Sequence, residues 1–168
     1  MKKLVTEFIG TFFLVLAVQL CVLGDAGNLA PIGIGAMLMI MVFAGGHISG
    51  AHYNPAITMA VFLSGQCAAS DVPGYIFAQF LGASLAALLC SGFLFDKVGH
   101  GIDLSLTGSQ AILAEALGTF AWSWVVLNVA TSKDTEGNSF YGLAIGTASY
   151  THLRAHETVL DLVCRLLL

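Results

Sequence analysis

Long apolar runs separated by short polar stretches are the dominant pattern of this 168-residue chain. A helix needs about 20 mainly apolar residues to cross a bilayer, and several runs approach or reach that length. We therefore expect spanning helices, two of them opened by Pro31 and Pro73, at about residues 4–24, 30–46, 73–95 and 109–130. A fifth apolar segment begins at Phe140 and is expected to stop near Ala148. Polar links are predicted at residues 25–28, 65–71, 96–107 and 131–139.

The composition supports a membrane protein. Hydrophobic residues make up 57% of the chain and charged residues only 10%, whereas a soluble domain carries about 25% charged residues. The net charge of −4 offers no basic patch for nucleic acid. The first apolar run is too long for the h-region of a signal peptide. The cysteines form no CxxC pair and no metal-ligand spacing, so we interpret them as buried or lipid-facing thiols: Cys21, Cys67, Cys90 and Cys164.

A polar segment, His47 to Ala56, directly follows the second apolar run. At membrane depth, irregular backbone survives only where protein or a water-filled cavity shields it. Asn54 suits a helix N-cap and Pro55 suits the first helical position. We therefore expect an irregular loop at residues 47–53 and a short helix from Asn54 to about Ser64, too short to span. Its positive end would face something wet, and a pore is the simplest explanation.

The chain also repeats itself. Residues 6–12 (TEFIGTF) and 114–120 (AEALGTF) share Glu, Gly, Thr and Phe at the same spacing, and residues 33–35 are weakly echoed by residues 144–146. The second copy lies three spanning helices after the first, so the two copies point in opposite directions through the membrane. This arrangement is typical of an inverted-topology repeat.

Three motifs together resemble a bacterial aquaporin of the major intrinsic protein family. They are Glu-x-x-Gly-Thr-Phe in the first helix, the His-Ile-Ser-Gly-x-His-x-Asn-Pro-Ala loop, and the pair Ala78-Gln79 in the third. The resemblance covers residues 1–146, with a first repeat at 1–95 and an incomplete second repeat at 109–146. It implies an all-α, aquaporin-like inverted repeat that in complete members has six spanning helices and two re-entrant half-helices. It also implies a passive channel for water or a small neutral solute such as glycerol, a homotetramer, and neither a reaction nor a cofactor.

The half-helix residues suit such a pore physically. The Asn54 side-chain oxygen can accept bonds from free backbone N–H groups, which leaves its NH₂ to donate to a passing oxygen. Pro55 has no N–H to leave unsatisfied, and Ala56 is small enough for a close approach. The positive start of the half-helix repels cations. A ladder of carbonyl acceptors leading to Asn54 is expected from Gly50, Ala51, His52 and Tyr53.

Other candidate residues are read partly through the resemblance. It places His47 at the cytoplasmic mouth, where a pH sensor and a hydrogen-bonded loop histidine are both open interpretations. His47 and His52 have no acidic or cysteine partner nearby, so no metal site is expected. The resemblance assigns Ile34 to a filter position that is usually aromatic in strict water or glycerol pores, which leaves selectivity open.

Two glutamates lie in predicted spanning helices, where a charge must be paired or neutral. The resemblance implies that Glu7 and Glu115 brace the re-entrant loops by accepting backbone N–H bonds, with Gln79 in the same scaffold. A proton relay is the alternative, but it would need a longer chain of acids. The small residues Gly10, Gly82, Ala83, Ala86 and Gly118 are expected at close helix crossings.

The second repeat breaks off. It predicts a second Asn-Pro-Ala somewhat beyond residue 160, but no proline follows Pro73 and no asparagine follows Asn138. We interpret residues 147–168 as a tail unrelated to the family, produced by a frameshift, an assembly junction or a genuine truncation. A natural amphipathic tail helix at the membrane surface is the alternative, with an apolar face of Leu153, Leu160, Val163 and Leu167.

Charge placement predicts the orientation. With a cytoplasmic N-terminus, Lys2, Lys3 and Lys133 lie inside and Lys97 outside, as the positive-inside rule favours. We expect a multi-pass protein of the inner (plasma) membrane.

Lacking the opposing half-helix, the chain is predicted not to conduct as a monomer. An inert or assembly-only fragment is the second hypothesis, and an intramembrane enzyme is a remote third, since the predicted spans hold no paired aspartates and Ser49 has no supporting motif.

Overall fold

The computed structural model describes residues 1–94 and 108–150, and side chains within these ranges except at 108–111, 114 and 150. The described ranges contain helices and no strand. The α-helices are α1 (Lys2–Leu23), α2 (Ala30–Ser49), α3 (Pro55–Leu63), α4 (Val72–Leu89), α5 (Gly108–Val126) and α6 (Tyr141–Tyr150). Short 3-10 turns occupy Gly27–Leu29 and Lys133–Thr135, and π-turns extend α4 through Cys90–Leu94 and α5 through Leu127–Thr131.

The predicted all-α membrane class is confirmed. Three helical stretches are long and apolar enough to cross a membrane, at Lys2–Leu23, Gly27–Ser49 and Val72–Leu94. They correspond to the first three predicted spans. The fourth predicted span corresponds to α5 with its π-turn, and the fifth apolar segment forms α6. The predicted loop at 96–107 and most of the predicted tail lie outside the described residues.

One predicted boundary was wrong. The irregular loop was expected to begin at His47, but α2 continues through Ser49 and the loop comprises only residues 50–53. Gly50 ends α2 in the left-handed conformation, with φ 90°, and its N–H donates to the Gly46 carbonyl at 3.0 Å. Glycine adopts this conformation without a Cβ penalty, so it fixes the end of the helix after His47, Ile48 and Ser49, which remain helical.

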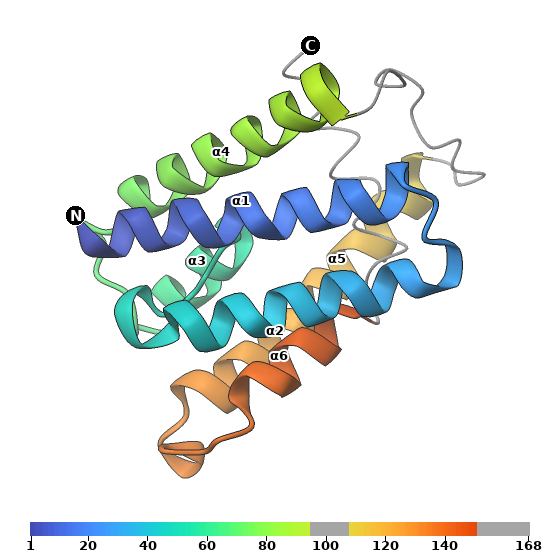
Figure 1. Cartoon of the computed structure of the whole chain (residues 1–168). Coiled ribbons are helices and arrows are strands. Elements are labelled where there is room, and N and C mark those ends of the chain that lie inside the picture. Colours follow the sequence, from blue (N-terminus) through green and yellow to red (C-terminus); the bar gives the residue numbers. More distant parts are fainter. Residues whose placement is uncertain (95–107, 151–168) are drawn as a thin grey trace.

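The first half of the chain packs around α1, which lies between α2 and α4 (Figure 1). A Cβ on Gly82 of α4 would collide with the Phe8 carbonyl oxygen of α1 and lie 3.1 Å from the Phe12 nitrogen. Two helix backbones can approach this closely only where no side chain separates them. Gly82 therefore lies at a close helix crossing, as its small size predicts.

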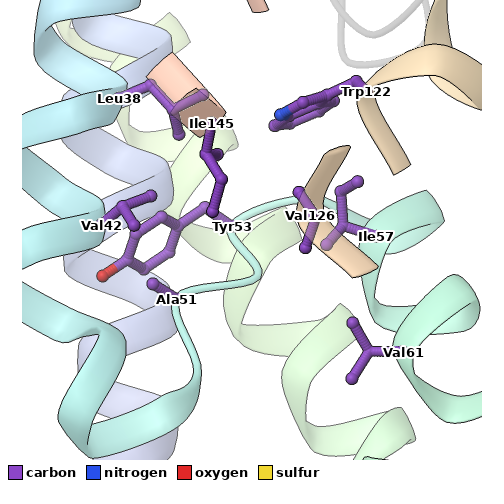
Figure 2. Packing of buried hydrophobic residues seen from close by; sticks show 9 residues of the cluster. All are labelled: Leu38, Val42, Ala51, Tyr53, Ile57, Val61, Trp122, Val126 and Ile145. Carbon is purple, nitrogen blue, oxygen red and sulfur yellow. The ribbon is translucent and has the colours of Figure 1, made fainter. Parts of the chain in front are cut away.

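The second half joins this core through α2. Helix α6 packs against α2, where a Cβ on Gly146 would lie 2.6 Å from the Gly35 carbonyl oxygen. A cluster of buried apolar side chains then links α2, the loop and α3 to α5 and α6 (Figure 2). This core cluster comprises Leu38, Val42, Ala51, Tyr53, Ile57, Val61, Trp122, Val126 and Ile145.

Candidate functional site

The loop between α2 and α3 has an unusual backbone. After Gly50, two non-glycine residues also have positive φ, Ala51 at 53° and Tyr53 at 51°. Such residues are uncommon, and surrounding contacts must hold them in place. Ala51, His52 and Tyr53 are all buried, so the contacts are made inside the protein.

Glu7 supplies most of those contacts. Its Oε1 accepts from Ser49 Oγ at 2.6 Å and from the His52 backbone N–H at 3.0 Å. Its Oε2 accepts from the Tyr53 N–H at 2.7 Å and from Gln79 Nε2 at 2.8 Å. Glu7 has no exposed surface. A buried carboxylate is costly unless its oxygens are hydrogen-bonded, and here both oxygens accept twice.

A second layer of bonds fixes the start of α3. Thr58 Oγ1 donates to the Asn54 carbonyl at 3.1 Å, and the same oxygen accepts from Gln79 Nε2 at 3.0 Å. His52 Nδ1 lies 3.2 Å from this hydroxyl. The Thr58 hydroxyl donates its hydrogen to Asn54 and accepts from Gln79, so its remaining lone pair fits the His52 tautomer that carries hydrogen on Nδ1. Gln79 thus connects the Glu7 carboxylate to α3.

Asn54 caps α3. Its Oδ1 accepts from the Ala56 N–H at 2.7 Å and from the Ile57 N–H at 3.3 Å. The residue is extended, with φ −154°, and Pro55 takes the first helical position. This is the geometry expected of an N-cap followed by proline. Within the described part of the chain, the Asn54 Nδ2 group makes no hydrogen bond, so it is available to donate elsewhere.

The loop carbonyls are also available. Across residues 1–94 and 108–150, no hydrogen bond to the carbonyl oxygens of Gly50, Ala51, His52 or Tyr53 is seen. Four consecutive acceptors therefore lead to Asn54 with their hydrogen-bonding capacity unused inside this part of the protein.

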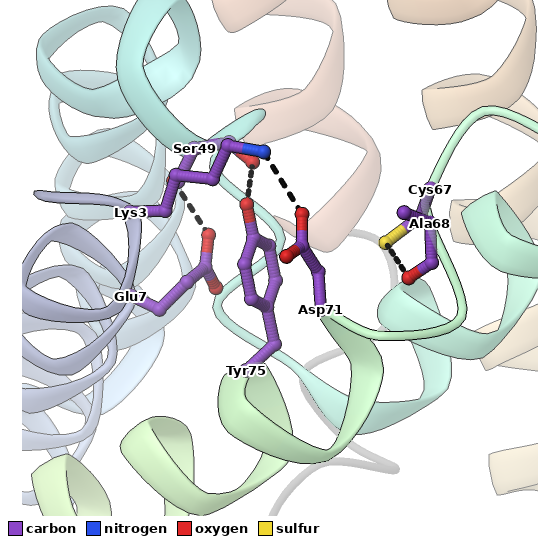
Figure 3. Close-up of polar contacts among 7 residues, drawn as sticks. All are labelled: Lys3, Glu7, Ser49, Cys67, Ala68, Asp71 and Tyr75. Atoms are coloured by element: carbon purple, nitrogen blue, oxygen red, sulfur yellow. Dashed lines mark hydrogen bonds and ion pairs between the residues drawn. The ribbon is translucent and has the colours of Figure 1, made fainter. Parts of the chain in front are cut away.

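Two contacts at this site were not predicted. Ser49 bonds Glu7, and Tyr75 of α4 donates from its hydroxyl to the Ser49 carbonyl at 2.7 Å (Figure 3). The last carbonyls of a helix have no intrahelical partner, so Tyr75 satisfies one that would otherwise be buried unpaired. Nearby, Lys3 and Asp71 form an ion pair of 2.8 Å that joins the start of α1 to the link before α4. The partners are far apart in the sequence, so the sequence analysis did not pair them. A serine at a helix end is a local sign of a side-chain hydrogen bond there.

The other candidates are separate from this cluster. His47 is exposed in the last turn of α2, whereas His52 is buried. Ile34 is only 4% exposed and packs against Val18. One carboxylate oxygen of Glu115, Oε2, is buried with no hydrogen-bond partner among the described residues. In the same part of the chain, no group of three His, Cys, Asp or Glu residues is placed to hold a metal.

Sequence comparison agrees with this geometry. The sequence model of the major intrinsic protein family matches residues 1–157. The chain belongs to the major intrinsic protein family. Members of this family are passive channels rather than enzymes. The match ends at residue 157, whereas the sequence analysis predicts that the family-like part ends at residue 146. That domain boundary stays a prediction.

The chain is similar in sequence to curated relatives from a bacterium and from plants. Glycerol uptake facilitator protein-like 6 of Lactiplantibacillus plantarum is 36% identical over 87% of this chain and 71% of its own length. Aquaporin NIP1-1 of Zea mays is 36% identical, covering 86% of this chain and 54% of its own length. Nodulin-26 of Glycine max is 37% identical, covering 88% and 57%. The chain thus spans little more than half the length of most relatives compared.

Proposed function

We propose that this chain forms the first half of the pore of a passive channel for water or a small neutral solute such as glycerol. The observation that carries the proposal is the loop of residues 50–53, which is fixed by Glu7 and leads to the Asn54 cap of α3. A permeant that passes beside this buried loop would supply hydrogen-bond donors to its unused carbonyls. The names of the relatives, which include an aquaporin and a glycerol uptake facilitator-like protein, support the same class of permeant.

The mechanism is selective permeation. The Gly50 to Tyr53 carbonyls accept hydrogen bonds from the permeant, and Asn54 Nδ2 donates to its oxygen as it passes. The aligned peptide dipoles of α3 place roughly half a positive charge at its start. This charge repels cations and disfavours a continuous proton-conducting chain of water. Pro55 and Ala56 keep the end of the helix compact, so an opposing half-helix can approach it.

The glutamates hold the walls in place rather than contact the permeant. Glu7 and Gln79 brace the loop of residues 50–53 through the bonds described above. By the internal repeat, Glu115 braces the corresponding loop of the second half, which would give its buried Oε2 its donors. Ile34 lies at the filter position of α2, and His47 lies at the cytoplasmic mouth.

The 168-residue chain contains a single Asn-Pro-Ala sequence. Asn54 needs an opposing half-helix to complete a narrow pore, so we propose that this chain does not conduct as a monomer. Assembly with a second chain that supplies the other half is the alternative role, and the complete protein would form a homotetramer in the inner membrane with a cytoplasmic N-terminus.

A chimera tests the channel proposal. Residues 1–146 would be joined to the part of the glycerol uptake facilitator-like relative that follows the position equivalent to residue 146, and the chimera would be reconstituted into liposomes. We expect the chimera to accelerate water or glycerol entry, and Asn54→Ala to reduce it. A folded chimera no faster than empty liposomes for either permeant would overturn the proposal. The unmodified 168-residue chain, measured in parallel, should match empty liposomes, and fast water flux would refute the non-conducting assignment.

A further inference from the structure

The side chain of Tyr53 is fastened to two helices. It is 3% exposed, and its hydroxyl donates to the Met41 carbonyl of α2 at 2.9 Å. Figure 2 shows the hydroxyl pointing from the loop towards α2, beside Val42. Tyr53 directly precedes Asn54, so this side chain anchors the loop at the residue before the α3 cap.

Two glycines create the space that Tyr53 fills. A Cβ on Gly10 of α1 would collide with the Tyr53 ring, and a Cβ on Gly45 of α2 would collide with its hydroxyl. Gly10 was predicted at a close helix crossing, and the atoms nearest to it are those of the Tyr53 ring. Removing a Cβ from both helices at the same level lets a large loop side chain lie between them.

The anchor acts on a backbone that is unfavourable by itself. Tyr53 has φ 51°, a conformation that costs a non-glycine residue free energy. Its N–H donates to Glu7 at 2.7 Å, and no donor from the described residues holds its carbonyl. Glu7 orients the peptide before Tyr53 by accepting its N–H. The Tyr53 side chain holds the residue itself, through its hydroxyl bond to Met41 and its ring between Gly10 and Gly45.

We propose that Tyr53 is a positioning residue of the loop, which sets the direction of the carbonyls of residues 50–53 by locking its side chain between α1 and α2. This inference rests on the proposed function in one respect, that the carbonyls of residues 50–53 contact the permeant. The local geometry is measurable without any flux, so its failure is distinct from a failure of the channel assignment.

The test uses the full chain in detergent micelles, with Tyr53→Phe compared against Tyr141→Phe. Tyr141 is half-buried and packs on Phe43, with no hydrogen bond from its hydroxyl to the described residues, so it controls for loss of a phenol oxygen. Labelling methionine with ¹³C at the carbonyl and valine with ¹⁵N selects Met41, because Met-Val occurs once in the sequence. Hydrogen exchange at the amides of residues 52 and 53 reports the loop.

We expect Tyr53→Phe to shift the Met41 carbonyl resonance and to speed exchange at residues 52 and 53 about fivefold, the effect of losing one hydrogen bond. Amides inside α1 and α4 should keep their rates. Gly10→Ala should speed the same loop amides further, because it displaces the ring. An unchanged Met41 resonance, unchanged loop exchange, or equal acceleration throughout the helices would overturn the proposal.

Discussion

Gln79 of α4 donates to Glu7 of α1 at 2.8 Å, at a place where the two residues are 1% and 0% exposed. The bond joins α4 to α1, and the same Gln79 nitrogen donates to Thr58 of α3 at 3.0 Å. All donors around Glu7 are N–H or O–H groups directed at acceptor oxygens. The loop conformation therefore depends on an acceptor-only side chain at position 7.

Replacing Glu7 with Gln tests this dependence. The Gln side chain keeps one acceptor oxygen but directs an NH₂ group at buried donors, which leaves them unpaired. We expect the free energy of unfolding to fall by about 3 kcal/mol, since buried hydrogen bonds to charged groups are the strong ones. Denaturant titration of the purified protein in micelles measures the change.

Glu136→Gln is the matched control, because Glu136 is exposed in the link before α6. The same chemical change there should leave the unfolding midpoint in place. Equal midpoints for the Glu7 variant and the unmodified protein would show that the carboxylate does not support the loop.

Asn54→Ala tests the cap of α3. Two backbone N–H groups, of Ala56 and Ile57, would lose their acceptor, at a cost of about 1 kcal/mol. We expect faster hydrogen exchange at these two amides. Ser132→Ala serves as the control, because Ser132 caps only a short 3-10 turn and accepts a single backbone N–H bond. Unchanged protection of both α3 amides would contradict the capping role.

Local features were well predicted from the sequence. The start of α3 depends on Asn54 and Pro55, whose effects act within one helical turn, so the sequence is sufficient. The predicted end of α2 was wrong, because the polar residues His47 and Ser49 are compatible with a helix as well as with irregular backbone. The decisive signal was conformational, the left-handed Gly50 that ends the helix.

Distant partnerships were only partly predicted. The bonds of Glu7 to residues 52 and 53 join positions more than 40 residues apart, and nothing in the local sequence selects them over other donors. Gly10 illustrates the limit. Its small size suggested a helix crossing, but only the packing shows that an aromatic ring occupies the space. Thr58 and Tyr75 were missed for the same reason.

Gly82→Ala tests the crossing of α1 and α4. The added Cβ would meet the Phe8 backbone oxygen, which cannot rotate away as a side chain can. We expect a loss of about 1–3 kcal/mol in the free energy of unfolding, as is typical of overpacking. Gly92→Ala is the control, because a Cβ there meets nothing within 4 Å. Equal stability of the two variants would show that the helices separate without cost.

Cys67 tests the predicted orientation. It lies in the link between α3 and α4, on the same side as the start of α1, because Lys3 pairs with Asp71. With a cytoplasmic N-terminus, a membrane-impermeant maleimide should label Cys67 in inside-out vesicles but not in intact cells. The other cysteines would be replaced, so that one thiol reports. Asn28→Cys, in a cysteine-free background, provides the opposite case at the exposed turn between α1 and α2.

The labelling pH follows from the surroundings of this thiol. Burial raises the pKa of Cys67, and nearby Asp71 acts in the same direction. Maleimide reacts with the thiolate, so the rate at neutral pH should be lower than for a fully exposed cysteine and should rise as the pH increases towards the raised pKa. Alkaline labelling therefore gives the clearest contrast between the two vesicle orientations. Labelling of Cys67 in intact cells, with Asn28→Cys protected there, would reverse the assigned orientation.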